Sequence, residues 1–217
     1  IDPYRVVRVD PDRVEYVAPQ ESIERFRRMG AGAPGDWDRS TTRFTDTDVF
    51  RAFEAHFEHG RDWEETDFFE RALRRILDGN EMWESHTHAE LRERFARIDD
   101  LYESIRQHGF RTQRELAETS IDDPVRYRRS TLRSRIRHDE VALDVGRDGT
   151  LLFEDGQHRF AIAKLLDVDE VPVLILKRHP QWVAFRDAVA EDVDRTGTLP
   201  DRFEDHPDLR HLVERRG

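Results

Sequence analysis

Apolar residues follow two different spacings along this chain. In the first half they recur three and four positions apart within 49–57, 68–77 and 95–105, which predicts three helices that each bury one face. Gly79 and Gly109 follow the second and third stretches and are expected to end those helices. Asp67 and Glu70, at the start of the second stretch, have the spacing of a capping box.

The second half contains shorter apolar runs. Residues 140–145 alternate between apolar and polar side chains, and residues 171–176 are almost continuously apolar, as is typical of strands. A turn at 147–149 follows the first run. Gly156 then separates a second strand from a helix that is expected to reach Leu166. The predicted order is strand, turn, strand, glycine, helix, strand.

The flanking segments complete the prediction. Residues 4–9 are expected to form a strand, residues 21–29 a short helix, and residues 30–35 a turn-rich loop. Trp182, Phe185, Val189 and Val193 predict a last helix after Pro180. The polar tail beyond Thr196 is expected to be only partly ordered.

The most informative candidate site lies where the second strand is followed by the helix. Unpaired N–H groups and a partial positive charge make a helix N-terminus a site for anions. Gly156 permits close approach of the backbone, Arg159 can clamp phosphate oxygens, and His158 can transfer a proton near neutral pH. The alternative is a structural turn, with Arg159 paired to Asp155 and His158 capping the backbone. The strand before and the helix after favour the anion site.

These residues resemble a motif of the ParB/sulfiredoxin superfamily. Asp155, Gly156, Gln157, His158 and Arg159 match its G-x-x-R or G-x-H-R turn, and residues 100–110 look like its L-x-x-S-I-x-x-x-G helix. The resemblance covers residues 95–178 and implies a nucleotide-binding core. The superfamily includes DNA-segregation proteins that bind CTP, a nuclease-like group, sulfiredoxins and kinases that act on free serine. Fold alone therefore does not select the chemistry.

Differences from the superfamily's motifs exclude one of these activities. Sulfiredoxins carry a catalytic cysteine where Gln157 stands, and this chain has no cysteine, so sulfinate reduction through that residue is excluded. The kinase branch has an Asp-Gly-His-His-Arg turn, whose aspartate Asp155 matches. The resemblance implies that Asp155 supports Mg²⁺ or acts as the base. Strand alternation points Glu154, an additional catalytic candidate, to the opposite face unless a bulge intervenes.

The resemblance also implies an acidic residue ahead of the Ser-Ile helix. The candidates are Glu81, Glu84, Glu90 and Glu93. Lys164, on the helix after the turn, is a candidate nucleotide ligand, although its long side chain can equally lie along the surface. Arg106 and the arginines of residues 126–137 are further candidates for phosphate contact, and for most of them a solvated helix face is the preferred interpretation.

Other motifs are interpreted mainly as structural. The Asp36-Trp37-Asp38 and Arg61-Asp62-Trp63-Glu64 motifs can bind a sugar or stack on a base, but tryptophans more often fasten loops to a core. His86 and His88 have metal-ligand spacing on a strand but lack a third ligand. His179 and Trp182 follow the last strand, where they can border the pocket.

Composition excludes several classes of function. The net charge is -11, from 47 acidic and 36 basic residues, and 34 of the bases are arginine. This pattern favours adaptation to a salt-rich cytoplasm over a mere GC-rich coding bias, and it disfavours nucleic-acid binding. The absence of cysteine excludes disulfides and thiolate metal sites. No run of eighteen apolar residues predicts a membrane span.

We therefore expect an α+β protein with a small mixed β-sheet. Residues 1–94 are expected to form an N-terminal strand and a mainly helical extension. Residues 95–178 are expected to form the ParB/sulfiredoxin-like core, and residues 179–217 a C-terminal helix and polar tail. The expected function is a cytoplasmic nucleotide-dependent kinase that uses ATP, ADP or CTP with Mg²⁺ to phosphorylate a small hydroxyl-bearing acceptor, such as an amino acid, sugar or polyol. The alternatives are a CTP-binding switch for DNA or a partner protein, and a nuclease.

Overall fold

Three strands from the second half of the chain form the centre of the sheet. In the computed structural model, β4 (Val141–Val145) lies between β5 (Leu151–Asp155), to which it is antiparallel, and β6 (Val171–Arg178), to which it is parallel. The structure describes residues 2, 4–19, 30–119, 121, 123–125 and 131–214. The predicted helix at 21–29 lies outside these residues. The protein is a mixed α+β structure, as expected, with the predicted strand–turn–strand–helix–strand order.

The N-terminal segment completes the sheet at both edges. β1 (Val6–Val9) pairs antiparallel with β6, β2 (Tyr16–Val17) pairs parallel with β5, and the strand order is β1-β6-β4-β5-β2. β3 (Ala31–Gly32) pairs with the last residues of β6 and brings the number of strands in this sheet to six. Residues 1–94 thus contribute three strands, where one was predicted, because β2 and β3 are too short to show a period.

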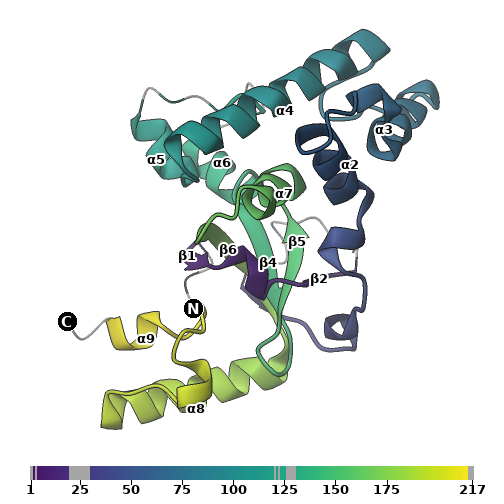
Figure 1. Ribbon diagram of the computed structural model, residues 1–217. Helices are drawn as coiled ribbons and strands as arrows, with labels where there is room; N and C mark the ends of the chain where they lie inside the picture. Colours follow the sequence, from purple (N-terminus) through teal and green to yellow (C-terminus); the bar gives the residue numbers. More distant parts are fainter. Residues whose placement is uncertain are drawn as a thin grey trace.

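Helices pack above the sheet (Figure 1). The helical layer contains α2 (Asp48–Phe57), α3 (Asp67–Leu77), α4 (His88–His108), α5 (Gln113–Glu118) and α6 (Leu132–His138). Thr66, and not Asp67, is the N-cap of α3, since its side chain accepts the N–H of Phe69. Gly109 ends α4 as predicted. α7 (Gln157–Leu165) lies between this layer and the sheet and contacts α2, α4 and β4.

Aromatic rings join these layers. Phe44 lies 4.7 Å from the ring of Phe153 on β5 and 4.8 Å from that of Phe160 on α7. Above them, Phe53, Trp63, Phe68 and Phe95 pack edge to face inside the helical layer. Burying each such ring contributes about 1.5–3 kcal/mol. Short 3-10 helices connect the elements: η1 (Pro11–Arg13), η2 (Trp37–Arg39), η3 (Phe44–Asp46), η4 (Trp63–Glu65) and η5 (Asp201–Phe203).

The C-terminal segment is more ordered than its polar sequence predicted. α8 (Pro180–Thr196) and α9 (His211–Glu214) lie at the opposite end of the sheet from the helical layer (Figure 1). Asp208 is buried, where it accepts hydrogen bonds from Arg178 and from Trp182 Nε1, and Leu209 is fully buried. Residues 197–214 thus pack against the rest of the protein, held by the buried Arg178–Asp208 pair and by apolar side chains such as Leu209 and Leu212.

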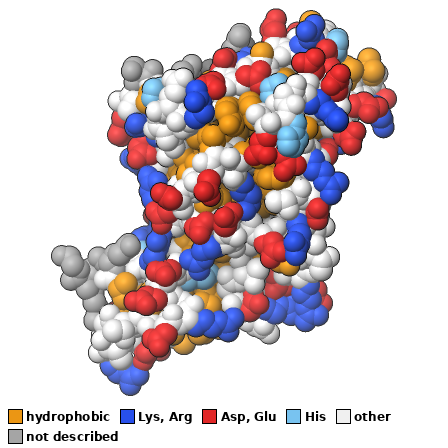
Figure 2. Space-filling model, in the orientation of Figure 1, with side chains coloured by type: hydrophobic (Ala, Val, Ile, Leu, Met, Phe, Trp, Pro, Cys, Tyr) orange, Lys and Arg blue, Asp and Glu red, His pale blue; other side chains and the backbone are white. Residues whose placement is uncertain are grey.

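Surface charge is finely mixed. On the face seen in Figure 2, acidic and basic side chains are interspersed, and apolar surface gathers in the upper half, near the helical layer. Exposed ion pairs such as Arg74–Glu70 and Arg106–Glu103 follow the helices. None of the helices in the described ranges has the length and apolarity that crossing a membrane requires.

The turn from β5 to α7 depends on a glycine. Gly156 has φ +90°, and a Cβ atom there would lie 2.9 Å from Cα of Val141. Gly197 has φ +79° but open space around it. Gly156→Ala should therefore lower the free energy of unfolding by about 1–3 kcal/mol more than Gly197→Ala, because only the first adds a clash to the strained backbone. Denaturant melts of the two variants measure this difference, and equal losses would show that β4 can yield to the added methyl group.

Candidate functional site

The N-terminus of α7 opens into a pocket of about 180 Å³. Gly156 is the N-cap residue, and because glycine has no side chain it cannot cap the first N–H groups of the helix. The Asp155 carboxylate accepts the N–H of Gly156 at 2.7 Å. The described lining residues come from α4, α7, β5 and the connections between elements: Trp83, Arg94, Asp123, Val125, Asp139, Phe153, Glu154, Asp155, Gly156, Gln157, His158 and Arg159. The structure thus brings together all the predicted site residues except Lys164.

Arg159 is held by a carboxylate that its local sequence did not suggest. Its Nη2 lies 2.5 Å from Oδ2 of Asp123, which also accepts a hydrogen bond from Gln113 Nε2 at 3.0 Å. Burial disfavours the charged form of both partners, but the attraction between them outweighs this effect. The pKa of Arg159 is therefore raised and that of Asp123 is lowered. The guanidinium therefore stays charged beside the pocket. Asp155, the partner expected in the structural-turn interpretation, is not the ion-pair partner of Arg159.

His158 occupies an apolar environment. Its ring is stacked against Phe53 at 5.8 Å and meets Trp83 edge to face at 5.0 Å. Burial, assisted by the positive charge of Arg94, lowers the pKa of His158 to about 3. Its Nε2 is buried and has no hydrogen-bond partner among the described residues. The expected proton transfer near neutral pH is thereby corrected: His158 is neutral there and offers a hydrogen bond, not a mobile proton.

Glu154 reaches the pocket because the strand is irregular. The pairing of β4 with β5 shifts between Ala142, which faces Asp155, and Leu143, which faces Phe153, so Glu154 is the extra residue of a bulge. The bulge that the alternation argument required is present. Glu154 and Asp155 both line the pocket, Glu154 half-buried and Asp155 exposed at the rim.

The upstream acid was not found where the sequence indicated. Among the described residues that line the pocket, none of Glu81, Glu84, Glu90 and Glu93 is present. Glu90 instead forms the capping box of α4 with Thr87. Asp123 and Asp139 supply the additional carboxylates, and both lie after the Ser-Ile helix in the sequence, not ahead of it.

Trp83 and Arg94 were also missed. Trp83 and Glu84 have φ +51° and φ +62°, in a turn closed by reciprocal backbone hydrogen bonds between Met82 and Ser85. Left-handed conformations are costly for such residues and persist where the surrounding structure enforces them, often at functional sites. This turn places the Trp83 ring against His158 at the pocket. Arg94, buried on α4, donates to the carbonyl of Val125 at 2.6 Å. No local pattern signals either role.

Other candidates lie elsewhere. Lys164 Nζ donates to the carbonyl of Pro11 at 2.8 Å and so fastens α7 to η1; it does not line the pocket. Arg106 pairs with Glu103 on the exposed face of α4. In the arginine-rich segment, residues 126–130 lie outside the described residues, and Arg135 is buried with its Nε donating to Gln113.

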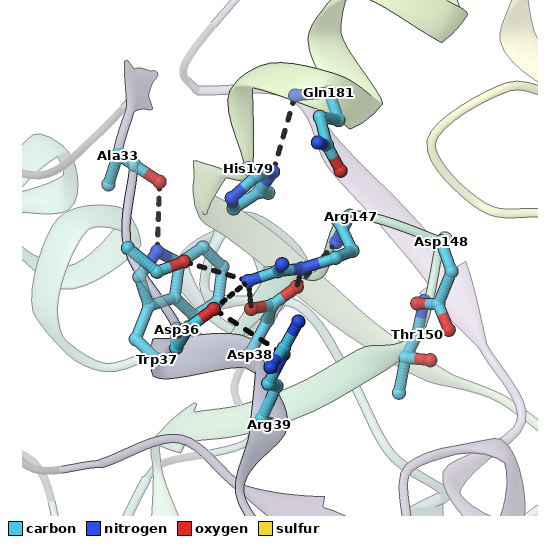
Figure 3. A network of polar contacts seen from close by, with 11 residues as sticks. Ala33, Asp36, Trp37, Asp38, Arg39, Arg147, Asp148, Thr150, His179 and Gln181 are labelled. Atoms are coloured by element: carbon cyan, nitrogen blue, oxygen red, sulfur yellow. Dashed lines mark hydrogen bonds and ion pairs between the residues drawn. The ribbon is translucent and has the colours of Figure 1, made fainter.

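The aromatic–acid motifs prove structural. Arg147, in the β4–β5 turn, donates to Asp38, Asp36 and the carbonyl of Gly35, which locks η2 to the sheet (Figure 3). These hydrogen bonds hold the pKa of Asp38 at about 2. The Trp37 ring covers the buried Lys177 ammonium at 4.3 Å. Trp63 is likewise buried and donates to Asp99.

The histidine motifs are structural as well. His179 caps α8 by accepting the N–H of Gln181 (Figure 3). Trp182, in the first turn of α8, is buried, and neither residue borders the pocket. His86 precedes the N-cap of α4 and His88 begins the helix, where it pairs with Glu64, so the pair does not lie on a strand.

The pocket offers carboxylates that could contribute to binding a metal ion. Across the described ranges there is no cluster of three or more histidine, cysteine, aspartate or glutamate side chains that could hold a metal ion. Mg²⁺ commonly binds through one or two carboxylates together with substrate phosphates and water. Asp155 at the rim suits that mode, so the residues fit a Mg²⁺ ion that arrives with a nucleotide and not one held by the protein alone.

The buried His158 gives the site a pH signature. The unfolded chain binds a proton at this residue near pH 6.5, whereas the folded protein does so only near pH 3. Protonation of His158 therefore does not affect the free energy of unfolding above pH 6.5, and lowers it progressively as the pH falls below that value. Relative to His158→Phe, the wild type should lose about 1.4 kcal/mol of unfolding free energy per pH unit between about pH 6 and pH 4. Urea melts of both proteins across this range measure it; a constant difference would mean that His158 is solvated.

Comparison with protein-family models, with curated proteins and with solved structures found no match.

Proposed function

We propose that this protein is a nucleotide-dependent phosphotransferase that acts on a small hydroxyl-bearing acceptor, such as an amino acid, sugar or polyol. The observation that carries the proposal is the meeting of a helix N-terminus, two arginines and four carboxylates in one pocket. This combination suits phosphoryl transfer, which depends on positioning and on electrostatic stabilisation of phosphate charge. The resemblance of the Asp155–Arg159 turn to that of free-serine kinases supports the same chemistry.

The phosphate end of the nucleotide is assigned to the start of α7. The backbone N–H groups of Gln157, His158 and Arg159 point along the helix axis toward the pocket, as the first N–H groups of any helix do. The guanidiniums of Arg94 and Arg159 add positive charge from two sides. At about 180 Å³ the pocket is smaller than the ~300–1,000 Å³ of whole-ligand sites, so it suits phosphates better than an entire nucleotide. Trp83, beside it, offers a ring on which a base can stack.

The carboxylates have separate assignments. Asp155 is the rim residue that would hold Mg²⁺ together with the phosphates, and the ion would neutralise charge on the transferring group. Glu154 accepts the proton of the acceptor hydroxyl as the new O–P bond forms and the bridging O–P bond of the nucleotide breaks. Asp123 keeps Arg159 oriented. His158, neutral at pH 7, donates or accepts one hydrogen bond.

A nucleotide-binding switch is the second candidate. The observation that favours it is that His158 is neutral and Arg159 is already paired, so only carboxylates remain for acid–base work. Such a protein, in the resemblance a CTP switch, would bind nucleotide with the same turn but transfer nothing. The experiment below separates the two.

Two variants divide binding from chemistry. Asp155→Asn keeps the shape of the rim but removes the charge that ligates Mg²⁺, so phosphoryl transfer should fall about 10²–10⁴-fold while nucleotide binding largely survives. Gln157→Glu places a negative charge at the helix N-terminus, which favours the fold but repels phosphate, so affinity should drop about tenfold without loss of thermal stability. Labelled ATP, ADP and CTP with Mg²⁺, offered to serine, sugars and polyols, report transfer, and calorimetry reports binding.

The outcomes separate the hypotheses. Unchanged transfer in Asp155→Asn would remove this residue from the mechanism. Nucleotide binding by the wild type without transfer to any acceptor would favour the switch. Equal affinity of the wild type and Gln157→Glu for every nucleotide would show that the start of α7 is not the phosphate site.

A further inference from the structure

A second pocket lies at the other end of the molecule. It is lined by residues of β1, β6, α8 and α9 and of the segment before β1, and has a volume of about 160 Å³. Figure 1 shows α8 and α9 at the opposite end of the sheet from α7. Apolar side chains such as Val7 and Ile175 form part of its wall. Its polar lining consists of three arginines, one histidine and two aspartates: Arg5, Arg178, Arg186, His211, Asp2 and Asp208. This excess of basic groups contrasts with the net charge of -11 for the chain.

Arg178 presents an unused donor to this pocket. Its Nε and Nη2 bind the two oxygens of Asp208 at 2.8 and 2.5 Å. Its Nη1 is buried and, among the described residues, has no hydrogen-bond partner, although the residue is only 5% exposed. Buried N–H groups nearly always have an acceptor. An acceptor from outside the protein would complete this side chain.

Asp208 does not serve as that acceptor. It already takes hydrogen bonds from Arg178 and from Trp182 Nε1, the latter at 2.9 Å. Burial opposes its ionisation, but the hydrogen bonds and charge of Arg178 more than offset this and lower its pKa, so it remains a carboxylate. Asp208 Oδ2 also lies 3.7 Å from Nε of Arg186. One carboxylate therefore faces two buried guanidiniums, and Arg5 adds a third, so the pocket keeps an excess of positive charge.

Arg186 and His211 also line this pocket. Arg186 Nη2 lies 3.0 Å from Nε2 of His211. Because a guanidinium can only donate, Nε2 is the acceptor, and the hydrogen of the neutral imidazole is on Nδ1. Both residues are more than nine-tenths buried. Arg5, half-buried, supplies a third guanidinium, and the opposing Asp2 is exposed to solvent.

The geometry points to a binding site for a small oxyanion, that is, a carboxylate or phosphate group, held by Arg5, Arg178 and Arg186. Guanidinium donors match such groups in shape and charge. The apolar wall leaves room for the short carbon chain of an organic acid. A bound anion would bridge β6, α8 and α9, and so would stabilise the C-terminal segment against the sheet. This site is independent of the proposed phosphotransferase pocket.

The test uses potassium acetate, succinate and phosphate, each compared with potassium chloride at equal ionic strength. At least one of the three should bind saturably in calorimetry and raise the melting temperature. Arg186→Gln and the less buried Arg5→Gln should each weaken that binding tenfold or more. Arg195→Gln, on the same helix with the same change of charge, should leave it unchanged. Comparing the three anions shows whether carboxylate or phosphate is preferred.

Further controls make the result decisive. Gln157→Glu should bind the anion as the wild type does; if it alone loses binding, the anion occupies the α7 pocket and the proposal is wrong. Absence of saturable binding by all three anions would also overturn it, as would equal binding by Arg186→Gln, Arg5→Gln and Arg195→Gln. None of these outcomes depends on whether the protein transfers phosphate.

Discussion

The close approach of Gly156 to Val141 determines where the rest of the site lies. A Cβ at position 156 would be 2.9 Å from Cα of Val141, so only glycine lets the chain leave β5 and begin α7 against β4. The bulge at Glu154 lies one pairing step before this turn and directs two consecutive carboxylates to the same pocket. The helix then begins with its N–H groups at the end of the sheet, and His158 enters the aromatic cluster of the helical layer. One backbone contact thus places donors, carboxylates and histidine together.

Buried ion pairs add to apolar packing in connecting the helical layer and the C-terminal segment to the rest of the protein. Arg159–Asp123 holds the loop before α6 to α7, and Arg178–Asp208 holds the C-terminal segment to β6. Lys177 lies 3.3 Å from Asp144 beneath Trp37, and burial, reinforced by the charge of Glu154, raises the pKa of Asp144 to about 7. The two arginine pairs are costly to break, because the remaining partner would be a buried charge with neither a counter-ion nor water. The Arg178–Asp208 pair, together with apolar side chains such as Phe203 and Leu209, also explains why the polar sequence beyond Thr196 packs on the sheet.

The sequence predicted those features that depend on neighbouring residues. The spacing of apolar side chains located α2, α3 and α4, and the strand–glycine–helix order located β5, Gly156 and α7, because both signals are local. Lys164 was misplaced for a different reason: a long side chain reaches several surfaces, and here η1 supplied carbonyl and carboxylate partners. No local pattern identified Asp123, Trp83 and Arg94. These residues join the site only because the fold brings them close to α7, which is distant from them in the sequence. The left-handed backbone conformation of Trp83 could not be predicted, because tryptophan rarely adopts it.

The central claim is that the first turn of α7 binds the phosphates of a nucleotide. Backbone amide chemical shifts in ¹H–¹⁵N spectra, followed during titration with magnesium nucleotides, test it most directly, because amide shifts respond to a bound anion without any substitution. The account predicts the largest saturable changes at the amides of Gln157, His158 and Arg159, with smaller changes at Trp83 and Arg94. Saturable changes confined to other parts of the chain, or none with any nucleotide, would contradict it.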